Sequence, residues 1–139
     1  MSDLHLVLVD TSVWVRFFRA EGSTNVQALD QLLSLAAVAT CGPIRAEVIS
    51  GAKTRREFQR LRDLFTAVRT LPPPDGIWNE IEAHRFALAR RGYQASLVDL
   101  WIALTAHTHG VALWTLDEDF QHIAAAVPLK RYIPDDVAA

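Results

Sequence analysis

The stretch that decides the fold is Leu6-Val7-Leu8-Val9-Asp10-Thr11-Ser12-Val13-Trp14. Four aliphatic residues in a row are typical of a strand that is buried on both faces. A carboxylate and two hydroxyls follow, and Thr11 or Ser12 can cap a helix whose apolar pattern begins at Val13. Asp10 is therefore predicted at the end of a central strand, on the edge of an α/β sheet where ligands bind.

Apolar runs and helical patterns alternate along the rest of the chain. Further strands are predicted at 37–41, 68–71, 111–114 and 129–133. Helices are predicted at 26–36, 44–51, 53–68, 75–91 and 96–109, with a short one after 117. In the helix at 75–91, the residues expected to face inward are Ile77, Ile81, Phe86 and Leu88. This alternation predicts one α/β domain over residues 1–139, a three-layer sandwich with a mostly parallel central sheet.

The composition excludes several classes of protein. Half of the 139 residues are hydrophobic and 22% are charged, which excludes a disordered chain. The net charge of −2 means that any basic surface for nucleic acid must be local. Cys41 is the single cysteine, so no intramolecular disulfide can form. No apolar run approaches the ~20 residues of a membrane span, so we expect a cytoplasmic protein without membrane contact.

Four carboxylates are predicted to meet at one edge of the sheet. Asp10 and Asp117 each follow an apolar strand, and Glu47 follows another strand by about two helical turns. Asp99 begins an otherwise apolar helix, where an unpaired carboxylate is costly. Because clustered carboxylates repel each other, such a site requires cations. Oxygen ligands without histidine or thiolate favour Mg²⁺ or Mn²⁺, and two such ions support the hydrolysis of phosphodiesters.

Each acidic residue also has a simpler interpretation. Asp10 and Asp117 could cap helices, and Ser96 and Asp99 have the spacing of a capping box. Glu47 could face solvent or pair with an arginine such as Arg45. These interpretations explain each residue separately but do not explain their common placement.

The sequence resembles PIN-domain ribonucleases, and most closely the VapC-type toxins of prokaryotic toxin–antitoxin pairs. The motifs that carry the resemblance are residues 9–14, the helical Glu47, residues 99–103 and residues 113–120, in this order over nearly the whole chain. The resemblance implies a PIN-like fold, Mg²⁺-dependent endoribonuclease activity, homodimerisation and inhibition by a cognate antitoxin.

The resemblance also assigns roles to residues. It implies an acidic quartet that binds metal and catalyses cleavage, consisting of Asp10, Glu47, Asp99 and Asp117. Asp119 is a possible additional ligand, and the hydroxyls expected to support the ligands are those of Thr11, Ser12 and Thr115. Separately, the basic helix at 53–68 places Arg55 and Arg56 as candidates for RNA contact, although such a face is also typical of a solvated helix.

Two other functions are compatible with parts of the pattern. A non-catalytic PIN-like module could act only in an antitoxin–promoter complex, which the complete quartet argues against. A receiver-like signalling domain also gathers acids at a sheet edge, but here the middle strands supply no phospho-accepting Asp and Lys130 has poor context. A phosphatase of the Asp-x-Asp type is disfavoured because position 12 is Ser.

Overall fold

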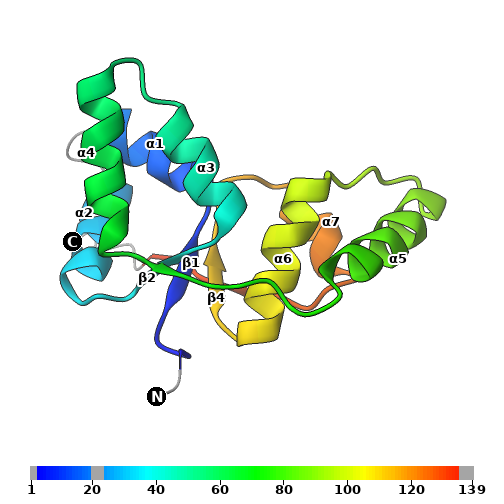
Figure 1. Cartoon of the computed structure of the whole chain (residues 1–139). Coiled ribbons are helices and arrows are strands. Elements are labelled where there is room, and N and C mark those ends of the chain that lie inside the picture. Colours follow the sequence, from blue (N-terminus) through cyan, green and yellow to red (C-terminus); the bar gives the residue numbers. More distant parts are fainter. Residues whose placement is uncertain (1–2, 20–23, 135–139) are drawn as a thin grey trace.

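In the computed structural model, which describes residues 3–19 and 24–134, five short strands form one all-parallel sheet (Figure 1). The strand order is β3-β2-β1-β4-β5. The strands are β1 (Val7–Val9), β2 (Val38–Thr40), β3 (Arg69–Thr70), β4 (Ala112–Trp114) and β5 (Lys130–Arg131). The all-apolar run therefore forms the central strand, as its composition predicts.

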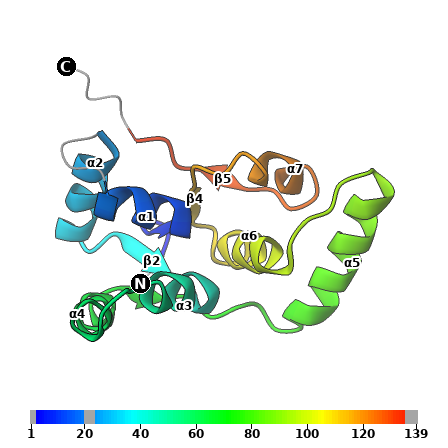
Figure 2. The same cartoon turned by 90° about the horizontal axis from the view of Figure 1, so that it is seen from above.

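Helices cover both faces of the sheet and make the predicted three-layer sandwich (Figures 1 and 2). One face carries α1 (Thr11–Arg19), α2 (Thr24–Ser34), α3 (Gly42–Ser50) and α4 (Arg55–Thr66). The other carries α5 (Ile77–Arg90), α6 (Leu97–His109) and α7 (Phe120–Ala124). This division follows from right-handed crossovers, because the chain first winds outward from β1 to β3 and then returns to β4 on the opposite side.

The register of the central strands sets the position of the acidic edge, the edge of the sheet at which the predicted carboxylates follow the strands. Val9 at the end of β1 lies opposite Trp114 at the end of β4, and the backbone N–H of Asp10 donates to the Trp114 carbonyl at 2.9 Å. The residues that follow these two strands, Asp10 and Thr115, therefore leave the sheet at the same level. Both side chains are buried in spite of their polarity.

The structure corrects two expectations, which concern three side chains. Phe86 does not face inward but is 65% exposed, because the buried stripe of α5 consists of Ile77, Ile81 and Leu88. Thr11 and Ser12 lie inside α1, where their hydroxyls bind Glu47 and Asp10 instead of capping the helix.

The helices of the described part of the chain are also too short or too polar to cross a membrane. None of those in residues 3–19 and 24–134 has the length and hydropathy that a bilayer span requires.

Candidate functional site

Asp10 is a buried carboxylate held by two hydroxyls. It is 6% exposed, and its Oδ2 accepts hydrogen bonds from Ser12 Oγ and Thr115 Oγ1, each at 2.8 Å. Hydrogen bonds to an ionised acceptor are among the stronger ones in proteins, and they offset the cost of burying the charge. The two hydroxyls occupy Oδ2 and leave Oδ1 for another partner.

The same two hydroxyls also hold the segment that follows β4. Ser12 Oγ accepts from the backbone N–H of Leu116 at 3.0 Å, and Thr115 Oγ1 accepts from that of Asp117 at 3.0 Å. Asp117 Oδ1 in turn accepts from the backbone N–H of Asp119 at 2.9 Å. A continuous chain of hydrogen bonds therefore fixes the position of the Asp117 segment relative to Asp10.

Asp99 lies in the first turn of α6, within the electrostatic field of the same acids. Burial is the main cause that raises its pKa from 3.8 to about 6. A hydrogen bond from Ser96 lowers this pKa, whereas the negative charges of Asp117, Asp10 and Asp119 raise it further. Asp99 therefore lies within electrostatic reach of the acids that follow β1 and β4.

Glu47 lies on α3, on the face of the sheet opposite to α6 and Asp99 (Figure 1). It is exposed on α3, and its Oε1 accepts a hydrogen bond from Thr11 Oγ1 at 3.1 Å. Cys41, which follows β2, is fully buried, and burial is the main cause that raises its pKa to about 11, with the charges of Asp10 and Glu47 adding to the effect. Cys41 is therefore a neutral thiol and a poor nucleophile at neutral pH.

The interpretation of the acidic residues as helix caps holds only in part. The Asp10 carboxylate binds hydroxyls, and it is the backbone carbonyl of Asp10 that accepts from Val13 and Trp14 at the start of α1. Ser96 does cap α6, since its Oγ accepts from the backbone N–H of Asp99 at 3.0 Å. That bond uses the backbone of Asp99 and is compatible with a separate role for its carboxylate.

The donor chemistry of this cluster fits a hard cation. Every acid of the cluster offers carboxylate oxygens, which Mg²⁺ and Mn²⁺ prefer, and the mutual repulsion of the acids falls when a cation binds. Within residues 3–19 and 24–134, no three His, Cys, Asp or Glu side chains already converge as a finished metal site. The carboxylates therefore share an edge but would have to turn toward a cation.

The basic residues predicted to contact RNA lie apart from α6. Arg55 and Arg56 are exposed at the start of α4, on the opposite side of the sheet from α6 (Figure 1). Arg56 also lines a groove of about 530 Å³ between α1 and α4, together with Phe18 and Arg60. The arginine weighed as a partner for Glu47, Arg45, donates instead to the Phe65 carbonyl at 3.1 Å.

One residue near these acids, Tyr93, was not predicted from the sequence. Its hydroxyl donates to the backbone carbonyl of Asp119 at 3.2 Å, and its ring stacks on His122. Tyr93 lies in the connection between α5 and α6, and no motif marks it, because its partners are defined only once α7 is in place.

Comparison with known proteins gives consistent results. Residues 7–126 match the PIN domain family. The VapC ribonuclease Mb1587 of Mycobacterium bovis is 35% identical over 129 residues, which cover 90% of this chain and 96% of that protein. Ribonuclease VapC6 of Mycobacterium tuberculosis is 32% identical over 102 residues, or 71% of this chain and 76% of that protein.

Solved structures show the same fold at lower identity. The VapBC-1 structure from nontypeable Haemophilus influenzae has a TM-score of 0.73 at 21% identity, covering 91% of this chain and 96% of that one. FitAcB from Neisseria gonorrhoeae has a TM-score of 0.71 at 20% identity, covering 93% of this chain and 98% of that one.

Proposed function

This chain belongs to the PIN-domain family, within the group of VapC relatives, and from that membership we propose that it is a metal-dependent endoribonuclease toxin of a type II toxin–antitoxin pair. The observation that carries the proposal is the position of Asp99. A half-buried carboxylate with a pKa near 6, facing the charges of Asp117, Asp10 and Asp119, is costly in the absence of a cation. That arrangement is expected where a cation is to bind.

In this proposal the acidic quartet of Asp10, Glu47, Asp99 and Asp117 holds Mg²⁺ or Mn²⁺, with Asp119 as an additional ligand. When bound, such cations activate water and stabilise the leaving oxygen of a phosphodiester. The protein's part is to hold the acceptor oxygens in place. Ser12 and Thr115 donate to Oδ2 of Asp10 and so fix the orientation of its carboxylate.

Asp99 and Glu47 contribute in different ways. Burial and the neighbouring acids raise the pKa of Asp99 to about 6, and a bound cation would favour its ionised form. Glu47 is exposed and held by one hydroxyl, which leaves it the freedom to turn toward the cluster. Neither residue needs to act as the nucleophile, which in this chemistry is water.

The relatives support a proposal for the substrate and the partners. The curated relatives are named ribonucleases, and we propose RNA as the substrate in the cytoplasm, with Arg55 and Arg56 contacting its phosphates. Several solved neighbours are VapBC complexes, which supports a cognate antitoxin as partner. We also propose a homodimer, because Trp78, Phe86 and Leu97 line an apolar groove of about 520 Å³ between α5 and α6 that a second copy would cover.

One observation favours an additional role in a complex on DNA. Three of the similar structures are bound to DNA: VapBC2 from Rickettsia felis on a promoter fragment, FitAB on the IR36 fragment, and VapBC from Salmonella typhimurium. The net charge of this chain is −2, so it lacks the overall positive charge that favours DNA binding. The DNA contacts of such a complex would therefore come from the antitoxin.

The test is RNA cleavage by the purified chain, free of antitoxin, in Mg²⁺, Mn²⁺ or EDTA. We expect cleavage with either cation and none in EDTA, and recovery when excess Mg²⁺ is restored. The Asp10→Asn variant, purified in parallel, controls for contaminating nucleases. Cleavage that persists in EDTA for the wild-type protein alone would overturn the metal-dependent mechanism.

A further inference from the structure

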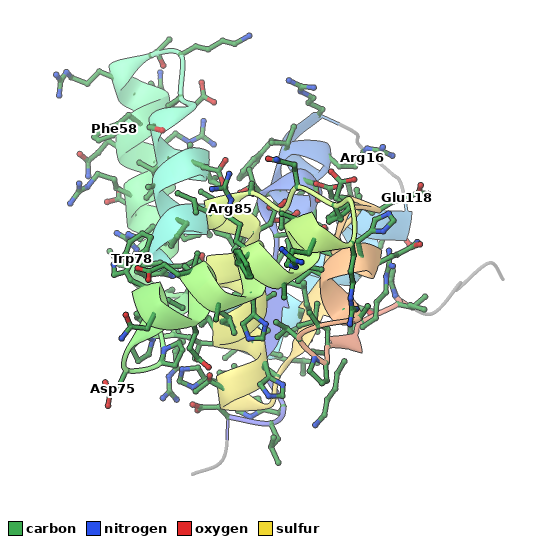
Figure 3. The ribbon with its side chains drawn as sticks, turned by 90° about the vertical axis from the view of Figure 1, so that its right-hand side faces the viewer. Arg16, Phe58, Asp75, Trp78, Arg85 and Glu118 are labelled. Carbon is green, nitrogen blue, oxygen red and sulfur yellow. The ribbon has the colours of Figure 1, made fainter. Side chains whose placement is uncertain are left out.

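Residues 91–96, which connect α5 and α6, make three hydrogen-bonded contacts. Arg85 on α5 donates from Nε to the Ala95 carbonyl at 3.1 Å, and Figure 3 shows Arg85 at the upper edge of α5. Ser96 caps α6 through the N–H of Asp99. Tyr93 supplies the third contact, and this is the one that crosses to another part of the acidic edge.

Tyr93 contacts α7 and the segment before it in two ways. Its ring stacks on that of His122 with centroids 4.1 Å apart and planes at 22°. Its hydroxyl donates to the Asp119 carbonyl at 3.2 Å. The connection that leads into Asp99 is thereby joined to the segment that carries Asp117 and Asp119.

The joined segments carry charges that repel each other. Asp117 and Asp119 both act on the Asp99 carboxyl as like charges. Since the backbone N–H of Asp119 also binds Asp117 Oδ1 at 2.9 Å, a contact that holds Asp119 holds the Asp117 carboxylate as well. Ser12 and Thr115 hold the Asp117 segment to Asp10, and Tyr93 adds a direct contact that joins this segment to the one leading into Asp99.

We propose that Tyr93, with His122 behind it, is a positioning residue that fixes the separation between Asp99 and Asp117 against their repulsion. This inference rests on the proposed function in so far as a cation uses the two acids together. A cluster that is already held in place binds its cation more tightly, because the cation does not have to draw the ligands together. Tyr93 touches neither substrate nor cation in this role.

The experiment compares three variants. Tyr93→Phe removes the hydroxyl and keeps the ring, His122→Leu removes the stack and keeps the hydroxyl bond, and Tyr132→Phe is the matched control. Tyr132 is the other tyrosine of the chain, and its ring packs on Trp114 instead. Each protein is measured by amide hydrogen exchange in EDTA, by calorimetric titration with Mn²⁺, and by kcat and KM for RNA.

For Tyr93→Phe we expect faster exchange of the Asp119 amide in EDTA and Mn²⁺ binding weaker by about 3- to 10-fold, the value of one lost hydrogen bond. We expect kcat to fall by a similar factor while KM for RNA stays unchanged. His122→Leu should change in the same direction, and Tyr132→Phe should match the wild type in exchange at 116–122 and in Mn²⁺ binding.

The two proposals fail in different ways. Wild-type exchange at Asp119 and wild-type Mn²⁺ affinity in both Tyr93→Phe and His122→Leu would overturn the positioning role, even if the protein cleaves RNA. Faster exchange in both variants, combined with a wild-type protein that neither binds Mn²⁺ nor cleaves RNA, would support the positioning role and overturn the proposed function.

Discussion

Thr115 Oγ1 donates a 2.8 Å hydrogen bond to Asp10 Oδ2, joining the ends of two neighbouring strands that lie far apart in the sequence. The same oxygen accepts from the backbone N–H of Asp117 at 3.0 Å. One buried hydroxyl therefore sets both the orientation of the Asp10 carboxylate and the path of the chain into Asp117.

Replacing Thr115 by Val tests this double role. Val has nearly the same shape, but it leaves a buried carboxylate with one donor fewer and the Asp117 N–H without its acceptor. We expect the free energy of unfolding to fall by about 1–3 kcal/mol and Mn²⁺ binding to weaken, as measured by urea unfolding and calorimetry.

The matched control for this variant is Thr105→Val. Thr105 is also fully buried, but its Oγ1 donates to the Trp101 carbonyl within α6. We expect a smaller loss of stability and unchanged Mn²⁺ binding. Equal Mn²⁺ affinity in the two variants would show that Thr115 serves the fold alone.

The sequence was sufficient to predict that these acidic residues lie at one edge of the sheet. An apolar run that ends in Asp10, and a second that ends just before Thr115 and Asp117, place these residues at one edge once the sheet is parallel. The hydrogen-bond partners were not predictable in this way. Whether Ser12 caps α1 or turns to Asp10 depends on Leu116, which approaches only in the folded sheet.

Phe86 shows a second limit of sequence patterns. At ~100° per residue it lies on the opposite side of α5 from Ile77, so one apolar stripe cannot include both. The pattern contained two partial stripes, and only the structure shows that the one with Ile77, Ile81 and Leu88 is buried. Phe86 instead lies under the guanidinium of Arg90, 5.5 Å from its ring centroid.

The double variant Arg55→Ala with Arg56→Ala tests the proposed RNA contact. Each phosphate contact adds to the dependence of affinity on salt, with a slope of about 0.7 per contact for single strands. We expect weaker RNA binding and a smaller salt slope, measured by fluorescence anisotropy at several salt concentrations, with unchanged Mn²⁺ binding.

The control removes two exposed arginines from the other side of the sheet, with Arg90→Ala and Arg91→Ala. This control variant changes the net charge by the same amount as the variant with Arg55→Ala and Arg56→Ala. If both double variants lower the slope alike, overall charge explains the effect and α4 is an ordinary solvated helix.

Asp99→Asn separates a cation ligand from a helix cap. The contact with Ser96 uses the backbone N–H of residue 99, which Asn retains, so the cap should survive the change. Removing a charge from the cluster should leave cation-free stability equal or higher. Cleavage should fall by about 100-fold or more, because the cation that activates water is lost or misplaced.

Ser96→Ala is the complementary variant. It should lower stability by about 1 kcal/mol and leave cleavage by the folded protein largely intact. Thermal melts with and without Mg²⁺, together with one RNA cleavage assay, measure both variants. A less stable but active Asp99→Asn protein would mean that Asp99 contributes to the fold and not to catalysis.

The raised pKa of Asp99 also predicts how stability depends on pH in EDTA. In the folded protein this carboxyl keeps its proton up to about pH 6, whereas in the unfolded chain it loses it near 3.8. Between these values the folded state binds more protons, so this group makes the free energy of unfolding decrease as pH rises. The decrease is complete above the folded pKa.

The Asp99→Asn variant lacks this titration. The difference between its free energy of unfolding and that of the wild type therefore reports the titration of Asp99 alone, because the other titrating groups are common to both proteins. Between pH 4 and pH 7 we expect the free energy of unfolding of the variant to rise by about 1 kcal/mol relative to that of the wild type. This value is smaller than a full two-unit pKa shift would give, because solvent screens a half-exposed carboxyl. Urea unfolding in EDTA at several pH values measures the difference. Mg²⁺ at pH 7 should then stabilise the wild type more than the variant, since the cation binds the ionised carboxylate. A difference that stays constant with pH, or that shrinks as pH rises, would show that the pKa of Asp99 is not raised in the folded protein.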